Sequence, residues 1–163
     1  MKFTQFTGET MVKAAISGYY GFKNFGDEAI LAVLVNHLKK LENVDITVFS
    51  SDTDFTSKTY SVNSVKRFDL KNVIKTVKEA DILVSGGGSL LQDVTSFKSL
   101  VYYSLIIALG LLFNKKVIIF AQGIGPLNSK PAQFIVKNLL KHCSLVTVRD
   151  ENSLNLLKKW KIN

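Results

Sequence analysis

The sequence has very little cysteine and proline, and each shortage excludes a class of protein. Cys143 is the only cysteine, so the chain has no disulfide framework and no CxxC metal-binding or redox motif. Two prolines and 21% charged residues are too few for a disordered or proline-rich chain. The remaining composition, with 47% hydrophobic residues, predicts a globular domain in a reducing, cytoplasmic setting.

A long apolar run is also missing. The most apolar stretch covers residues 100–113, which is shorter than the roughly 20 residues of a membrane-spanning helix. It predicts a helix buried in the protein, with a helix embedded in a membrane surface as the alternative. Residues 1–11 lack the basic start and apolar centre of a secretory signal. We expect them to form a disordered leader before a single domain at residues 12–163.

Acidic residues are in the minority, at 13 against 21 lysines and arginines, which gives a net charge of +8. This balance favours anionic partners, such as phosphorylated small molecules, acidic lipids or nucleic acid. No nucleic acid partner is expected, because the basic residues are scattered over predicted helices and do not interleave with aromatic residues on a strand. Weak peripheral contact with the inner face of a membrane is expected from five late lysines: Lys137, Lys141, Lys158, Lys159 and Lys161.

What the sequence does have is an alternation of short β-branched runs and longer amphipathic segments. Strands are predicted at residues 12–17, 45–50, 65–68, 82–85, 116–121 and 145–148. Helices are predicted at residues 27–41, 70–79, 97–113, 129–142 and 151–160, whereas residues 51–63 are polar and show no clear pattern. Alternation through short connections predicts a doubly wound parallel sheet of roughly five to seven strands, which is a Rossmann-like α/β fold.

Four glycine-rich or polar loops each follow a predicted strand directly. They are residues 18–28, Gly86–Ser89, Gln122–Pro126 and Arg149–Asp150. In a parallel α/β sheet the carboxyl ends of the strands meet at one edge, where ligands bind between the loops. The sequence therefore predicts one binding site at this edge, to which all four loops contribute.

The first loop does not match the common phosphate-binding motifs. Its glycines lack the spacing of the dinucleotide motif GxGxxG, and Asp27 and Glu28 stand where a P-loop needs Lys and Ser or Thr. The loop instead predicts free backbone amides that bind hydroxyl groups or a diphosphate. The alternative is a tight turn in which Asp27 and Glu28 only cap the next helix. Its candidate substrate-binding residues are Gly18, Tyr19, Gly21, Asn24, Gly26, Asp27 and Glu28.

The second loop is the more specific one. Gly86, Gly87 and Gly88 follow a buried strand, where glycine is costly in entropy and allows a close approach to the backbone. A bound ligand is the favoured explanation, with Ser89 aiming its amide at an anion or capping a helical turn. Close packing within the protein is the alternative.

The last two loops contribute a side-chain amide, from Gln122, and a cation, from Arg149, to the predicted site. Gln122 offers its side chain and Gly123 and Gly125 offer flexible backbone, although a turn that clears a neighbouring loop explains them equally well. Arg149 is a natural clamp for carboxylate or phosphate; the alternative is that it pairs with Asp150 or with a carboxylate of the first loop. No metal motif is present, and structural roles are expected for both histidines, His37 and His142.

Four segments in this order, GYYGFKNFGDEAIL, SGGGSLLQD, AQGIGPL and VTVRDENS, resemble the polysaccharide pyruvyl transferase family. The resemblance covers residues 12–160. It implies a GT-B-like enzyme of two Rossmann-like halves that uses phosphoenolpyruvate as co-substrate, with no separate cofactor. It also implies a saccharide acceptor from a cell-wall or exopolysaccharide pathway, often carried on a polyprenyl diphosphate at the cytoplasmic membrane face.

The resemblance is limited to the amino-terminal half of family members. The general acid of the family belongs to the carboxyl-terminal half, and of the donor contacts only the arginine after the last strand carries over, to Arg149. The resemblance therefore implies an isolated chain that is inactive and needs that missing half.

Two other functions stay open from the residues alone. One is half of a GT-B glycosyltransferase that uses a nucleotide sugar, and the other is a flavodoxin-like binding module complete in itself. A complete module should be a monomer, whereas half of an enzyme should expose an apolar face or form a homo-oligomer through it.

Overall fold

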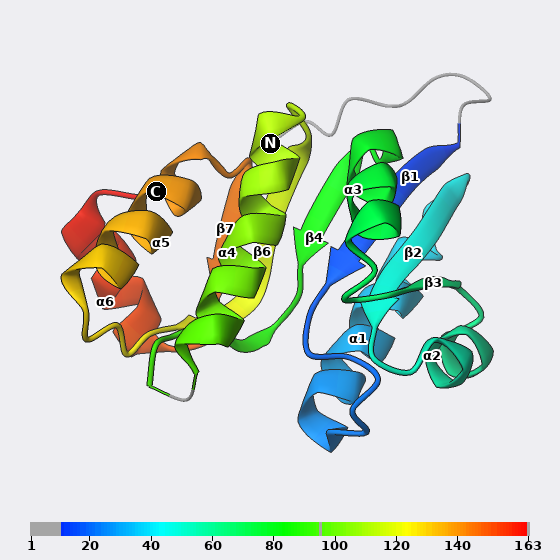
Figure 1. Ribbon diagram of the computed structural model, residues 1–163, viewed down its shortest axis with the longest axis horizontal. Coiled ribbons are helices and arrows are strands. Elements are labelled where there is room, and N and C mark those ends of the chain that lie inside the picture. Colours follow the sequence, from blue (N-terminus) through cyan, green and yellow to red (C-terminus); the bar gives the residue numbers. More distant parts are fainter. Residues whose placement is uncertain (1–10, 95, 163) are drawn as a thin grey trace.

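The computed structural model describes residues 11–94 and 96–162 and shows a parallel sheet between helices (Figure 1). The sheet has seven strands in the order β3-β2-β1-β4-β6-β5, and β7 also pairs with β6. The strands are β1 (Val12–Ser17), β2 (Val44–Ser50), β3 (Asn63–Lys66), β4 (Ile82–Ser85), β5 (Gly88–Leu91), β6 (Lys116–Ile124) and β7 (Leu145–Val148). The helices are α1 (Phe25–Leu38), α2 (Thr53–Tyr60), α3 (Leu70–Glu79), α4 (Phe97–Leu112), α5 (Lys130–His142) and α6 (Glu151–Trp160).

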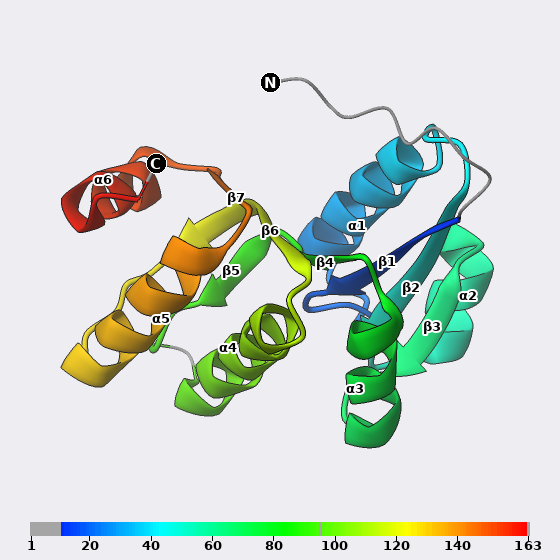
Figure 2. The same cartoon turned by 90° about the horizontal axis from the view of Figure 1, so that it is seen from above.

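The sheet is covered on both faces, which explains why its central strands are apolar throughout. Figure 2 shows α1 on one side of the sheet and α3 and α4 on the other. Central-strand residues such as Ile16, Leu83 and Ile119 are fully buried between these layers. The predicted doubly wound, Rossmann-like α/β fold is therefore confirmed.

Most predicted elements are confirmed to within three residues, but two loop predictions were wrong, and one segment for which no element was predicted contains a helix. The polar segment 51–63 contains α2, whose amino end is capped by Asp52 accepting from the Phe55 N–H at 3.0 Å. Residues 88–91 form β5, and residues 122–124 extend β6 where a loop was expected. β5 and the last residues of β6 pair with each other, since Gly88 lies opposite Gln122 and Leu91 lies opposite Ile124.

A bulge in β6 makes this extra pairing possible. Ala121 has a left-handed backbone with φ 47°, and the register against β7 shifts between Ile119 and Gln122. The Thr147 hydroxyl fills the bulge, because it accepts from the Ala121 N–H at 2.8 Å and donates to the Ile119 carbonyl at 3.1 Å. Bulges re-aim the residues that follow them, and here the end of β6 turns toward β5.

The apolar stretch at residues 100–113 forms most of α4, as the buried-helix interpretation predicted. Leu100, Tyr103 and Ile107 face the core, whereas Leu105 and Leu112 are exposed. Within residues 11–94 and 96–162, no helix has the length and apolar character needed to cross a membrane. The expected leader falls almost entirely outside the described residues.

Candidate functional site

Residues from all four predicted loops meet at the carboxyl edge of the sheet. The Arg149 Nη2 donates to Ser89 Oγ at 2.8 Å. Gly123 lies beneath this pair, since a Cβ atom there would be 3.0 Å from Ser89 Oγ and 3.1 Å from Arg149 Nε. A Cβ on Gly88 would lie 2.7 Å from Asp27 Oδ1. We call Asp27, Gly88, Ser89, Gly123 and Arg149 the Arg149 cluster.

Arg149 is held in the cluster but remains open to solvent. Its side chain is 49% exposed, and its Nε lies 3.9 Å from Asp150 Oδ2. Asp150 is itself engaged as the cap of α6, where it accepts from both the N–H and the hydroxyl of Ser153 at 2.8 Å. The predicted pairing with Asp150 is therefore present as one long contact, which leaves guanidinium surface available to an anion.

Asp27 is the half-buried acid of the cluster. Burial raises the pKa of its carboxyl group, and the neighbouring Glu28 raises it further, while Arg149 acts in the opposite direction. A carboxyl group with a raised pKa beside an open cation is a common feature of functional sites.

Glu28 and Asn24 make hydrogen bonds within the protein, and their contact with substrate stays a prediction. Glu28 accepts from the Gly21 N–H at 2.9 Å and from the Tyr60 hydroxyl at 2.7 Å, so it fixes the first loop to α2. Asn24 caps α1 by accepting from the Gly26 N–H at 3.1 Å. The alternative in which Asp27 and Glu28 cap the helix was wrong about the capping residue, because Asn24 already fills that position.

Most of the predicted glycines lie against protein atoms. A Cβ on Gly18 or Gly86 would overlap the Tyr20 ring, which is fully buried beneath the first loop. A Cβ on Gly87 would meet the Ile30 side chain at 2.9 Å and the Ala121 carbonyl at 3.2 Å. The expected open space above the triple glycine is therefore filled by the protein itself.

The other glycines differ in their surroundings. Gly21 has φ 77° and lies against Ser50 and the backbone at Ser51 and Asp52, whereas Gly26 is exposed. Gly125 has φ 87° and is half-buried after β6. Contact of these glycines with substrate stays a prediction.

Gln122 lies in the core and does not point at the edge of the sheet. Its side chain is fully buried and its Nε2 donates to Ser85 Oγ and to the Gly86 carbonyl, both at 2.7 Å. The expectation that it offers an amide to a ligand was wrong in this respect, because the bulge at Ala121 turns it inward. Its role here is to hold the triple glycine against β6.

Sequence reasoning missed one residue of this edge, Arg67. It follows β3 and is only 5% exposed. Tyr19 and Phe22 of the first loop stack on each other, with ring centroids 4.0 Å apart, and both rings lie beside the Arg67 guanidinium. The sequence pattern could have pointed to Arg67, because Arg67 and Arg149 are the only two arginines in the chain and each follows a strand.

The remaining titratable residues have structural surroundings. His37 and His142 are exposed and bond back to the carbonyls of Val33 and Asn138 in their own helices. Burial raises the pKa of the Cys143 thiol to about 12, which makes it unreactive. In the described part of the chain, no group of three or more His, Cys, Asp or Glu residues could hold a metal ion.

The parallel sheet, with its loops gathered at the carboxyl edge, defines a Rossmann-like domain of the kind that forms one half of a GT-B enzyme. A solved structure from Listeria monocytogenes, whose name assigns it as a UDP-N-acetylglucosamine 2-epimerase, matches with a TM-score of 0.56 and 13% sequence identity. The match covers 92% of this chain and 42% of the epimerase chain, so this chain spans less than half of that structure.

The family is shown by sequence. The sequence model of the polysaccharide pyruvyl transferase family matches residues 24–163, and the chain therefore belongs to the polysaccharide pyruvyl transferase family. No curated protein sequence matches it.

Proposed function

We propose that this chain forms the amino-terminal half of an enzyme that transfers pyruvate from phosphoenolpyruvate to a saccharide as a ketal. The observation that carries the proposal is the Arg149 cluster, an open guanidinium positioned by Ser89 at the carboxyl edge of the sheet. Membership of the polysaccharide pyruvyl transferase family supports the reaction class.

The chemistry needs a fixed positive charge and a proton donor. Protonation of C3 of the enolpyruvyl group makes C2 electrophilic, and one sugar hydroxyl adds to C2. A second hydroxyl then displaces phosphate and closes the ketal ring. Arg149 binds the carboxylate or phosphate of the donor and stabilises the charge of the departing phosphate.

Asp27 has the surroundings of a proton acceptor for the attacking hydroxyl. Its carboxylate lies near the Arg149 charge, and its pKa is raised mainly by burial. A base is more effective when its pKa approaches the working pH. The general acid comes from the carboxyl-terminal half, because His37 and His142 are exposed on α1 and α5 and bond to their own helices.

The acceptor and its location follow from the same proposal. A cell-wall or exopolysaccharide sugar on a polyprenyl diphosphate would place the enzyme at the cytoplasmic face of a membrane. The net charge of +8 supports contact with an anionic surface.

One observation favours a second candidate, half of a glycosyltransferase that binds a nucleotide sugar. The structural neighbour carries the name of an enzyme acting on UDP-N-acetylglucosamine. Binding of UDP-N-acetylglucosamine and of phosphoenolpyruvate to the chain, compared by titration calorimetry, separates the two candidates. Preference for the nucleotide sugar would favour the second candidate and overturn the first.

The decisive test of the first candidate uses the chain joined to a carboxyl-terminal half from a family member. We expect release of phosphate from phosphoenolpyruvate that depends on an acceptor sugar. Arg149→Ala should lower kcat/KM by about 100-fold or more, the scale for loss of a preorganised charge contact. Lys75→Ala, a change of an exposed cation on α3, is the matched control and should leave kcat/KM unchanged.

Two results would contradict the proposal. The first is wild-type kinetics in a folded Arg149→Ala enzyme. The second is acceptor-dependent phosphate release by the 163-residue chain alone, which would place the general acid among its own carboxyl groups, such as Asp27.

A further inference from the structure

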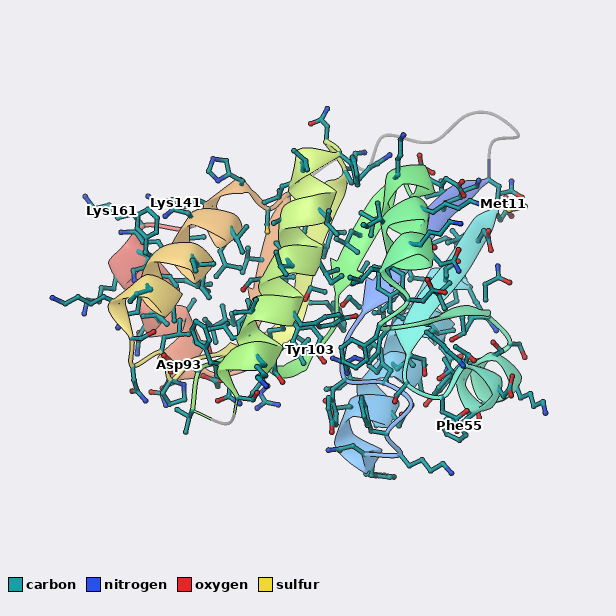
Figure 3. The ribbon with its side chains drawn as sticks, viewed as in Figure 1. Met11, Phe55, Asp93, Tyr103, Lys141 and Lys161 are labelled. Carbon is teal, nitrogen blue, oxygen red and sulfur yellow. The ribbon has the colours of Figure 1, made fainter. Side chains whose placement is uncertain are left out.

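Arg67 is a buried cation inside a cage of aromatic rings. Its side chain lies among residues from the first loop, from the segment after β3 and from α4. The guanidinium carbon lies 4.6–6.0 Å from the ring centroids of Tyr102, Phe68, Phe22, Tyr103 and Tyr19. Figure 3 shows Tyr103 projecting from α4 toward the middle of the sheet. Such ring faces attract a guanidinium electrostatically.

The rings do not satisfy the in-plane donors of the guanidinium. Arg67 Nε and Nη1 are both buried and have no hydrogen-bond partner among the described residues. The ion pair found within residues 11–94 and 96–162 joins Arg149 to Asp150, so no carboxylate there compensates Arg67. The buried Nε and Nη1 donors therefore lack an acceptor among the described residues, and an anion in the plane of the guanidinium would supply one.

The position of Arg67 is one where ligands bind in this class of fold. The cage joins the loop after β1 to α4, above the centre of the sheet where the strand order passes from β1 to β4. Other buried groups without a partner in the described chain lie along the same segments, namely the hydroxyls of Ser17, Tyr20, Tyr103 and Ser104.

An open hollow adjoins the cage. It has a volume of about 360 Å³ and is lined by Ser50, Ser51, Lys66, Arg67, Phe68 and Asp69. Lys66 adds a second positive charge, and Phe68 is a largely exposed wall of the cage. The Tyr19–Phe22 pair forms another wall that is partly exposed. The hollow therefore reaches Arg67 from solvent, and its lining carries the positive charge of Lys66 and the negative charge of Asp69.

We propose that Arg67 is a second anion-binding residue of this cleft, which holds a phosphate or carboxylate group of a substrate through its Nε and Nη1 donors. The assignment of that group to a substrate rests on the proposed function. β3 and β7 are five steps apart in the sheet, roughly 24 Å at the usual strand spacing. Arg67 and Arg149 thus approach the cleft from opposite sides. The group on Arg67 comes either from phosphoenolpyruvate or from a diphosphate on the acceptor.

The two arginines allow a direct test by NMR. A chain labelled with ¹⁵N-arginine gives two Nε–Hε signals, which an Arg149→Lys variant assigns. Inorganic pyrophosphate and phosphoenolpyruvate are titrated separately into the labelled chain. We expect a saturable shift of the Arg67 signal with at least one of the two anions, and the identity of that anion distinguishes the acceptor from the donor as its source.

Variants and controls make the test independent of the proposed function. Arg67→Lys keeps the charge but loses the planar fork, and should weaken binding of that anion at least tenfold. Arg149→Lys is the matched control and should leave the Arg67 shift in place. The inference is overturned if the Arg67 signal does not move with either anion in the wild-type chain, a result that does not depend on any variant folding. Movement of the Arg149 signal alone would support the proposed function while rejecting this site.

Discussion

Asp27 and Glu28 are adjacent carboxyl groups at the start of α1, and their surroundings differ sharply. Glu28 accepts hydrogen bonds from the Gly21 N–H and the Tyr60 hydroxyl, so its charge stabilises the fold. Asp27 faces Gly88 and carries a pKa raised first by burial, so its charge is a cost to the fold. We therefore expect the Glu28 carboxylate to stabilise the fold and the Asp27 carboxylate to destabilise it.

Replacing each acid by its amide tests this difference. A carboxyl group with a raised pKa binds more protons in the folded state, so its contribution to the free energy of unfolding falls as pH rises from the ordinary Asp value of 3.8 through the raised pKa. Asp27→Asn should therefore be more stable than wild type at neutral pH, with the gain shrinking as pH falls toward 3.8. Urea denaturation at several pH values measures this.

Glu28→Gln is the matched control and should lose about 1–3 kcal/mol at neutral pH, because charge-assisted hydrogen bonds are weakened. A loss of stability in Asp27→Asn at neutral pH would contradict the assignment of Asp27 as a strained acid.

At the scale of elements, the bulge in β6 determines the shape of the site. It turns Gln122 inward, lengthens the strand to Ile124 and lets β5 pair with it. The bulge depends on the Thr147 hydroxyl, which bonds to the backbone of β6 on both sides of the shift in register. A side chain on β7 therefore stabilises an irregular backbone on its neighbour.

Thr147→Val keeps the shape of this side chain and removes its hydroxyl. The Ala121 N–H would lose its acceptor, at a cost of about 1–3 kcal/mol. Thr47→Val on β2 is the matched control, since the Thr47 hydroxyl makes no hydrogen bond within the described residues, and it should change stability by less than about 0.5 kcal/mol. Chemical denaturation measures both, and equal effects of the two variants would argue against the role of Thr147.

The packing of α1 on the sheet gives a second prediction at this scale. Gly87→Val should lower the free energy of unfolding by about 1–3 kcal/mol through overpacking, because its side chain would overlap Ile30 of α1 and the Ala121 carbonyl. Gly26→Val is the control, since only Asn24 lies near a Cβ there, at 3.6 Å. Wild-type stability with lost binding of phosphoenolpyruvate would instead support the ligand role that the sequence suggested for Gly87.

At the scale of the whole molecule, exposed lysines gather on the last two helices of the chain, α5 and α6. Lys141, Lys158, Lys159 and Lys161 are exposed on or beside α5 and α6. Figure 3 shows Lys141 and Lys161 at the same end of the molecule. An anionic membrane surface attracts each such lysine by about 1 kcal/mol.

Cosedimentation with vesicles containing phosphatidylglycerol tests this attraction. We expect salt-sensitive binding that a triple change of Lys141, Lys158 and Lys159 to Glu abolishes. The charge-matched control reverses Lys71, Lys75 and Lys78, which are exposed on α3, and should retain most of the binding. Equal losses in the two triple variants would show that only net charge matters and would reject a specific membrane-facing side.

Local patterns in the sequence were enough to predict the class of fold and the edge of the sheet at which the four loops lie. Apolar runs, amphipathic periods and capping residues are local signals, so strands such as Val12–Ser17 and helices such as Leu70–Glu79 could be predicted from neighbours in the chain. Arg149 could be placed at the edge because it directly follows a regular strand. These predictions needed no knowledge of which segments touch.

What surrounds those residues depends on contacts between distant segments. The space above Gly86 is filled by Tyr20, Gln122 is turned into the core, and Arg67 is enclosed by rings from α4 and the first loop. Each of these contacts joins segments far apart in the chain, and no local pattern encodes which side chain will fill a given space. Packing across the sheet therefore shows which glycines the fold requires and which side chains surround each of the two arginines.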